Sequence, residues 1–271
     1  AMAAGCPVVI KPAEDTPLSA LALAKLAGEA GFPPGVFNVV TGKDPVPIGN
    51  ELTQNPLVRK ISFTGSTEVG KRLMRQSADS VKKVSLELGG NAPFIVFDDA
   101  DLDAAIEGAI ACKYRNGGQT CVCANRIFVQ DSIYEAFVEG FSRAVQTLEV
   151  GAGMADVHIG PLINQEAVEK VERILSDAVA NGAELVLGGD RSELGGTFFQ
   201  PTVVKNATRE MACFREEIFG PVCHIEKFTT EEEVIAASND TSFGLCASIW
   251  TNDINVAHRV APQLSVGMVW I

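Results

Sequence analysis

The sequence has no long apolar run and no cluster of basic residues. Its longest apolar stretches fall well short of the roughly 18 residues that a membrane-spanning helix needs, and Lys11 and Glu14 interrupt the first of them. We therefore expect no membrane anchor and no signal peptide. The formal net charge of −12 argues against a nucleic-acid-binding surface, because phosphate recognition requires clustered Lys and Arg. An anionic ligand would have to be held by a local group.

The residues that build disulfides and metal centres are scattered along the chain. The cysteines number seven, an odd count without the spacing of a disulfide framework, which favours a reducing, cytoplasmic compartment. The three histidines lie far apart without ligand spacing, so we expect no metal site. The residues in question are Cys6, Cys112, Cys121, Cys123, Cys213, Cys223, Cys246, His158, His224 and His258.

The chain does contain enough apolar residues, 46% of 271, for one large core or two smaller ones. Residues 8–86 alternate short β-branched runs with helical stretches, a pattern typical of a parallel sheet. We place a domain boundary at Gly89, between residues 1–88 and 89–271. The first section has expected strands at 8–10, 36–40, 60–63 and 81–88, and expected helices at 17–30, 45–53 and 67–77.

The second section, residues 89–271, also has an α/β pattern. A glycine-rich loop at 116–120 lies between its first helix and its second strand. The chain therefore predicts two α/β domains, the first with a parallel sheet. Expected strands lie at 93–97, 125–130, 184–187, 199–204, 223–228, 245–251 and 266–271, and expected helices at 101–113, 132–147, 165–181, 230–238 and 253–261.

Cys121 is the first candidate for chemistry. It follows the run Asn116-Gly-Gly-Gln-Thr120, a flexible loop whose amides could face an oxyanion. A cysteine acts as a nucleophile when it is partly exposed and its thiolate is favoured. The alternative interpretation is a small, buried and inert side chain.

Glu87 ends a strand-like run directly before Leu88-Gly89-Gly90. The two glycines allow a sharp turn, which would leave the carboxylate near an open crevice. It could serve there as a general base for water, and its interest comes from being paired with Cys121. The alternative is a solvated residue at a strand end.

Two further segments follow strands of the first section. Phe63-Thr-Gly65-Ser66-Thr opens a helix, where a Rossmann-like sheet holds a ligand phosphate, although a plain helix cap explains Ser66 as well. Lys11 and Glu14 follow the strand VVI and could hold ribose hydroxyls, with the acid repelling a 2′-phosphate. A surface ion pair is the alternative for these two residues.

Four separated segments match one family in order and spacing. VVIKPAEDTP, FTGSTEVG, LELGGNAPFIVF with RNGGQTC, and EEIFGPV together resemble the aldehyde dehydrogenase superfamily, over essentially the whole chain. The pairing of ELGG with GQTC is highly specific to it. Within the superfamily, KPAEDTP and YRNGGQTCVCANR most resemble the succinate-semialdehyde dehydrogenase branch. The resemblance implies a partial Rossmann-like cofactor domain followed by an α/β catalytic domain.

The resemblance also implies roles for individual residues. Cys121 would attack the aldehyde carbon, and Glu87 would activate the water that hydrolyses the thioester. Lys11 and Glu14 would hold the adenosine ribose, and Glu14 favours NAD over NADP. By the same resemblance the pyrophosphate would lie by Gly65 and Ser66, the nicotinamide ribose by Glu217 and Phe219, and the whole enzyme would be a homo-oligomer.

Two residues near Cys121 receive more specific hypotheses. In the succinate-semialdehyde branch an arginine at the place of Arg115 resembles a clamp for the distal carboxylate of the substrate, since a guanidinium forks onto a carboxylate; the alternative is a helix C-terminal cation. Cys123 could be a resolving thiol that forms a reversible disulfide with Cys121, or a packed, inert residue.

Both ends of the chain differ from the family pattern. The oxyanion-hole asparagine of the family would lie before Ala1, and its last strand would lie after Ile271. We therefore expect the isolated 271 residues to be poorly active or inactive. Three rival interpretations stay open: a dehydrogenase for another small or ω-carboxylated aldehyde, a non-catalytic nucleotide-binding relative, and a hydrolase that pairs its cysteine with a distant histidine.

Overall fold

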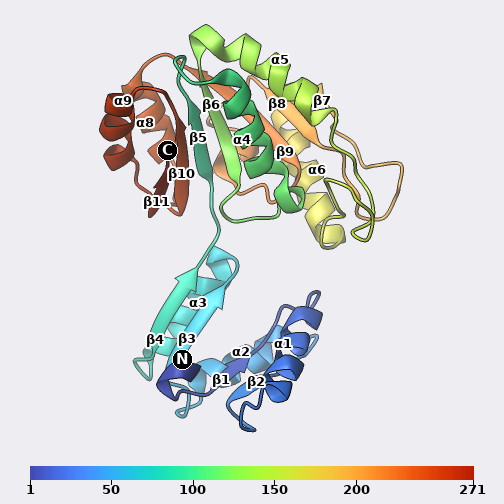
Figure 1. The fold of residues 1–271 in the computed structure, drawn as a ribbon, viewed down its shortest axis with the longest axis vertical. Coiled ribbons are helices and arrows are strands. Elements are labelled where there is room, and N and C mark those ends of the chain that lie inside the picture. Colours follow the sequence, from blue (N-terminus) through green and yellow to red (C-terminus); the bar gives the residue numbers. More distant parts are fainter. The chain divides into compact units, whose positions relative to one another are not determined.

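The computed structural model describes residues 1–271, which divide into two compact units (Figure 1), Ala1–Leu88 and Gly89–Ile271. The sequence-based boundary lies at the same residue. Both units alternate strands with helices, so the predicted α/β class is confirmed. Neither unit has a helix with the length and apolar character of a membrane span.

Unit 1, Ala1–Leu88, contains two separate parallel strand pairs, β1 with β2 and β3 with β4. The strands are parallel as predicted, but no hydrogen-bonded ladder joins the pairs into one sheet. The helix α1 buries none of its residues. The elements are β1 (Val8–Ile10), α1 (Leu18–Glu29), β2 (Phe37–Val39), α2 (Pro45–Gln54), β3 (Lys60–Thr64), α3 (Thr67–Ala78) and β4 (Lys83–Glu87), after a 3-10 turn at Met2–Ala4.

Unit 2, Gly89–Ile271, is built on a seven-stranded sheet in the order β11-β10-β5-β6-β9-β8-β7. All neighbouring strands are parallel except β7 and β8, which form an antiparallel edge pair. The strands are β5 (Ala92–Val96), β6 (Ala124–Gln130), β7 (Glu184–Leu187), β8 (Thr202–Lys205), β9 (Val222–Phe228), β10 (Cys246–Trp250) and β11 (Met268–Trp270).

Helices cover both faces of this sheet. They are α4 (Leu102–Tyr114), α5 (Tyr134–Val145), α6 (Gln165–Ala180), α7 (Ala212–Arg215), α8 (Glu231–Asn239) and α9 (Ile254–Val260), with 3-10 turns at Arg115–Gly118, Asp131–Ile133 and Ala261–Gln263. The four-residue α7 is the one helix that the sequence pattern does not predict, because it is too short to show a periodicity.

The alternation of side chains along β5 explains how the sheet joins two cores. Phe94 and Val96 pack with residues of α4 and α5, whereas Ile95 packs with residues of α8 and α9. Successive strand residues point to opposite faces, and a strand covered on both sides is apolar throughout. All five residues of β5 are buried, each large apolar one contributing about 1.5–3 kcal/mol. This rigid strand positions the loops at its ends.

Candidate active site

The candidate residues of unit 1 lie at the carboxyl ends of its strands. Lys11 directly follows β1 and forms an ion pair with Glu14. The Lys11 hydrogen bond holds the pKa of the Glu14 carboxyl below its ordinary value. The ion pair weighed as an alternative for these residues is therefore present, with Glu14 more exposed than Lys11.

Gly65 and Glu87 lie side by side at the same edge. The amide of Gly65 donates to the carbonyl of Glu87 at 3.0 Å, and the carboxylate of Glu87 is exposed. Ser66 is the N-cap of α3, its hydroxyl accepting from the amide of Val69 at 3.3 Å. The cap interpretation of Ser66 is thus realised. The first amides of α3 still have no partner within the helix.

In unit 2 the candidate residues lie at the amino ends of the strands. Helix α4 ends at Tyr114, and three successive residues then adopt left-handed backbone conformations: Asn116 at φ 54°, Gly117 at φ 63° and Gly118 at φ 75°. Two of the three residues are glycines, which adopt positive φ readily because they lack the β-carbon that disfavours it. The loop turns the chain back so that Cys121 precedes β6.

The conformation of the Cys121 loop is held by Gln119. Its side-chain oxygen accepts from the amide of Ile163 at 2.8 Å, and its side-chain nitrogen donates to the carbonyl of Asn116 at 3.1 Å. Cys121 is half-buried, and its amide donates no hydrogen bond to another backbone group. The thiol is therefore partly exposed, and the amide has no backbone acceptor.

Three predicted segments meet around Gly90. A β-carbon on Gly90 would lie 2.0 Å from the carbonyl oxygen of Cys121, and one on Gly89 would lie 2.8 Å from the carboxylate of Glu217. The amide of Gly90 donates to Glu217 Oε1 at 2.9 Å. The GG, GQTC and EEIFGPV segments are thus in direct contact, and at Gly90, where the neighbour is backbone, only glycine fits.

Glu217 and Phe219 have unusual environments. Burial raises the pKa of the Glu217 carboxyl, while the Gly90 hydrogen bond and the charge of Lys170 act against the rise. Phe219 has φ 55°, a left-handed conformation that costs a bulky residue about 1–3 kcal/mol and is concentrated at functional sites. Both features fit a segment shaped for a ligand.

Arg115 lies directly after α4 and is exposed. It lines a pocket of about 530 Å³ together with Val122, the residue after Cys121, and the indoles of Trp250 and Trp270. The pocket is therefore apolar with one accessible guanidinium. Sequence reasoning identified Arg115 but not the two tryptophans. They lie on β10 and β11, which only the pairing of strands in the sheet brings near Arg115.

Cys123 is buried, and its thiol donates to the carbonyl of Gly118 at 3.4 Å. Burial raises the pKa of Cys112, and it raises those of Cys213, Cys223 and Cys246 to about 12. These four thiols are therefore poor nucleophiles.

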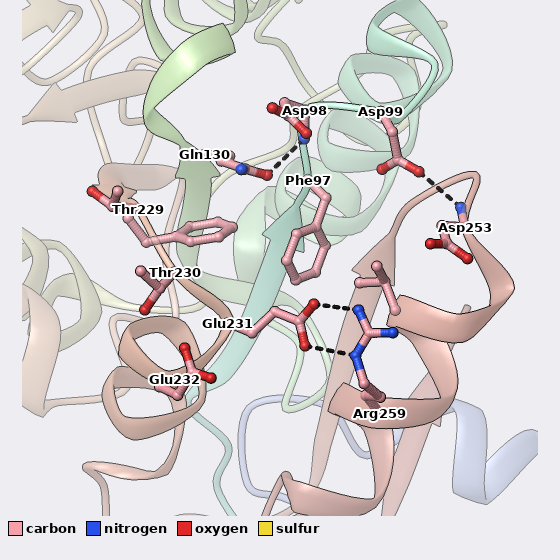
Figure 2. A pocket seen from close by; sticks show the side chains of 12 residues that line it. Phe97, Asp98, Asp99, Gln130, Thr229, Thr230, Glu231, Glu232, Asp253 and Arg259 are labelled. Atoms are coloured by element: carbon pink, nitrogen blue, oxygen red, sulfur yellow. Dashed lines mark hydrogen bonds and ion pairs between the residues drawn. The ribbon is translucent and has the colours of Figure 1, made fainter.

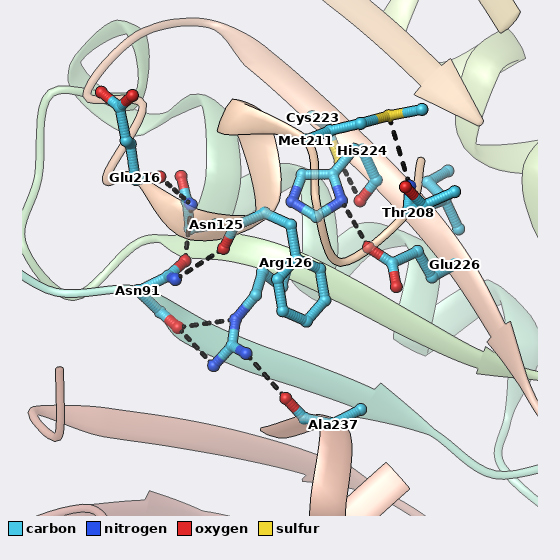
Figure 3. A network of polar contacts seen from close by, with 12 residues as sticks. Asn91, Asn125, Arg126, Thr208, Met211, Glu216, Cys223, His224, Glu226 and Ala237 are labelled. Carbon is cyan, nitrogen blue, oxygen red and sulfur yellow. Dashed lines mark hydrogen bonds and ion pairs between the residues drawn. The ribbon is translucent and has the colours of Figure 1, made fainter. Parts of the chain in front are cut away.

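Sequence reasoning also missed a buried polar network beside the site (Figure 3). The side chain of Asn125 bonds to Asn91 and to the backbone on both sides of Glu217. Next to it, the fully buried Arg126 donates to the carbonyls of Asn91, Ala237 and Ser238. Burial lowers the pKa of Arg126 to about 10. The sequence signal for this network was the position of Asn91, a polar residue between the Gly89-Gly90 pair and the start of β5.

A second pocket of about 660 Å³ lies at the opposite, carboxyl ends of β5, β6 and β9 (Figure 2). Its cation, Arg259, is paired with Glu231 through two hydrogen bonds, and Asp99 accepts from the amide of Asp253 at 2.8 Å. None of the predicted site residues lines it. Its one cation is thus already paired, and it holds no candidate nucleophile.

Comparison with known proteins agrees with this geometry. The sequence matches the aldehyde dehydrogenase family over residues 1–271. It is 57% identical to a glutarate-semialdehyde dehydrogenase of Pseudomonas aeruginosa and 56% identical to an NADP-dependent succinate-semialdehyde dehydrogenase of Escherichia coli; each match covers 100% of this chain and 56% of the relative. A crystal structure of succinate-semialdehyde dehydrogenase from Burkholderia pseudomallei matches with a TM-score of 0.98 at 57% identity.

That match covers 100% of this chain and 56% of the crystallised one. The chain thus spans a little over half the length of the relatives it matches. The family match nevertheless extends from the first residue to the last, and the segments that carry the resemblance in unit 2 converge at Gly90. The resemblance drawn from the sequence is confirmed: the chain belongs to the aldehyde dehydrogenase family.

Proposed function

We propose that the protein oxidises an aldehyde with a distal carboxylate, succinate semialdehyde, to the corresponding acid, with NAD as the hydride acceptor. The observation that carries the proposal is the contact of three segments around Gly90. Its missing side chain lets the backbone approach Cys121, and its amide is bound by Glu217. A nucleophile and a cofactor-binding carboxylate thereby contact the same short glycine loop.

The residues of unit 1 fit a dinucleotide by their chemistry. Lys11 and Glu14 offer a donor and an acceptor for hydroxyls at the end of β1, and the amino end of the 12-residue α3 offers free amides for a phosphate. When bound, the nicotinamide ring accepts a hydride from the substrate carbon. Glu217 and Phe219 would hold its ribose.

Cys121 and Glu87 would carry out the two bond-forming steps. The thiolate of Cys121 adds to the aldehyde carbon, and the free Cys121 amide donates to the oxyanion that forms. After the hydride has left, a thioester on Cys121 remains. Glu87 removes a proton from water, the hydroxide adds to the thioester carbon, and the acid leaves as the thiolate is restored.

Arg115 supports the choice of an anionic substrate. The pocket it lines begins beside Cys121 and is otherwise apolar, and the chain carries a net charge of −12. A local guanidinium is what attracts and orients a carboxylate in such surroundings. The two relatives described above are both named for semialdehydes of dicarboxylic acids, and glutarate semialdehyde is the second candidate substrate.

The other rival interpretations receive less support. A hydrolase would need a histidine at the cysteine, but no hydrogen bond or ion pair links His158, His224 or His258 to Cys121. His224 is fully buried beside Glu226. A non-catalytic relative would not need a half-buried thiol with a free amide, and alkylation tests this directly.

The test compares variants of the protein at its full natural length. With succinate semialdehyde and NAD, Cys121→Ser is expected to lower turnover roughly a thousandfold or more, and Glu87→Gln to slow the step after thioester formation, so that one equivalent of NADH appears in a burst. Cys246→Ser is the matched control and keeps the parent rate. Equal alkylation rates at Cys121 and Cys246, with no turnover by the parent, would contradict the proposed function.

A further inference from the structure

The carboxamide of Asn125 forms hydrogen bonds to the backbone on both sides of Glu217. Asn125 Nδ2 donates to the carbonyl of Glu216 at 3.0 Å, and Asn125 Oδ1 accepts from the amide of Ile218 at 3.1 Å. The residues before and after Glu217 are thus tied to one side chain. This two-point contact, like a rung of a strand ladder, fixes the direction in which the Glu217 side chain leaves the backbone.

A second bond links this contact to the glycine loop. Asn125 Nδ2 also donates to Asn91 Oδ1 at 2.6 Å (Figure 3). Asn91 follows Gly90, and the Gly90 amide donates to the Glu217 carboxylate at 2.9 Å. The bonds therefore close a ring that runs from Glu217 through Gly90, Asn91 and Asn125 back to the neighbours of Glu217.

Hydrogen bonds fix the orientation of the Asn91 side chain in the ring. Its Nδ2 is used by the carbonyl of Phe214 at 2.9 Å and by Thr241 Oγ1 at 3.3 Å, so its Oδ1 faces Asn125. Asn91 is 3% exposed and Asn125 is 1% exposed. Buried amides cost free energy unless each polar atom is bonded, and a network bonded in full specifies one geometry.

An apolar pair of similar volume would fill the same space at less cost in desolvation, but it would leave the backbone on both sides of Glu217 without these partners. The pair therefore both satisfies these backbone groups and fixes their geometry. It acts on a carboxylate that accepts a hydrogen bond from the Gly90 amide.

We propose that Asn125, together with Asn91, is a positioning pair that sets the Glu217 carboxylate against the Gly90 amide and so orients it toward the nicotinamide ribose. The inference rests on the proposed function in one respect, the role of Glu217. The ring of hydrogen bonds does not depend on that function, and hydrogen exchange at the Gly90 amide measures it separately.

The experiment uses Asn125→Ala and the isosteric Asn125→Asp, which keeps the acceptor for Ile218 and loses both donations. The control is Tyr134→Phe, which deletes one buried side-chain bond to a backbone carbonyl, that of Ile225, at 3.1 Å. We expect both Asn125 variants to speed hydrogen exchange at the Gly90 amide at least tenfold, and the control to leave it unchanged. If Asn125→Ala does not fold, the exchange rate is measured in Asn125→Asp alone.

The cofactor readout is the dissociation constant for NAD. Asn125→Ala is expected to raise it about tenfold, or 1.4 kcal/mol. If Asn125 acts through Glu217, the double variant Asn125→Ala, Glu217→Gln binds NAD within about twofold of Glu217→Gln alone. A merely structural loss would instead multiply the two effects.

The two possible failures can be told apart. If the parent does not bind NAD, the proposed function fails. Hydrogen exchange at the Gly90 amide still tests whether Asn125 holds the ring together. Unchanged exchange at Gly90 in a folded Asn125 variant would overturn the positioning pair, as would multiplied effects in the double variant. Faster exchange at Gly90 with a coupled loss of NAD affinity would establish it.

Discussion

The α-carbon of Gly90 lies against the carbonyl oxygen of Cys121 so closely that an added β-carbon would be 2.0 Å from that oxygen. The neighbour is backbone and cannot rotate away. The loop that carries the nucleophile and the loop that carries the Glu217 contact are therefore held at one separation by the absence of a side chain.

Gly90→Ala should destabilise the protein and abolish turnover. The new methyl group must push the Cys121 carbonyl away, at a cost of about 2–4 kcal/mol. Urea denaturation measures the loss. Gly153→Ala is the control, since a β-carbon there meets no atom within 4 Å, and it should change stability by less than about 0.5 kcal/mol. Equal midpoints for the two variants would contradict the packing argument.

Glu217→Gln should become relatively more stable as the pH rises. Burial raises the folded pKa of Glu217 above its unfolded value, so the folded chain binds more protons between these two values and loses stability as the pH increases through them. The Gln variant has no such loss. Unfolding free energies at about pH 4 and about pH 7 should therefore shift in favour of the variant.

Glu172→Gln provides a control of opposite sign for this comparison. The Arg191 hydrogen bond lowers the folded pKa of Glu172, so the parent gains stability above the unfolded pKa and loses it as the pH falls. The parent should accordingly gain on this variant as the pH rises. The same sign for both variants would show that Glu217 is not held in a desolvated position.

Arg115→Ala should lower kcat/KM on succinate semialdehyde by roughly tenfold to a hundredfold, the value of a charge-assisted hydrogen bond. The rate on an uncharged aldehyde of equal length should stay within about twofold. Arg143→Ala, which removes an exposed arginine paired with Glu139, serves as the charge-matched control. A loss that is the same on both aldehydes would assign Arg115 to folding rather than to the substrate.

Glu14→Ser should improve the use of NADP relative to NAD. The carboxylate at the end of β1 repels a 2′-phosphate, and about 1 kcal/mol of repulsion in exposed surroundings corresponds to roughly fivefold in the ratio of kcat/KM values. One relative at 56% identity is NADP-dependent, so family membership leaves this choice open. Glu29→Ser, at the end of α1, changes the same charge elsewhere; a shift as large in that variant would remove Glu14 from cofactor selection.

Cys123→Ser should change the response of the protein to peroxide. If Cys123 resolves an oxidised Cys121, the parent regains activity with a thiol reductant, whereas the Ser variant is inactivated irreversibly. The Cys123 thiol is bonded to the Gly118 carbonyl, so the loop must open first, and recovery should be slow. Identical, unrecoverable losses in both proteins would leave Cys123 as a packed core residue.

Local patterns in the sequence were enough to predict most of the elements of this fold. The run PFIVF predicts a strand at 93–97, and β5 spans Ala92–Val96, buried throughout. Three successive glutamates from Glu231 predict a helix start, because negative charge suits the helix dipole, and α8 begins at Glu231 with Thr230 as its cap. Such features depend on residues close in sequence, whose backbone preferences and capping bonds act within one turn or one strand.

The sequence by itself determined the family, the α/β class and the identity of Cys121, Glu87, Arg115 and Glu217 as candidates, because these reside in short motifs. Only the tertiary structure decided that β3 and β4 form a pair apart from β1 and β2, that Trp250 and Trp270 line the pocket of Arg115, and that Asn91 and Asn125 meet. Asn91 and Asn125 are 34 residues apart. Their contact depends on the order of strands in the sheet and on which face each residue takes, and no local pattern carries that information.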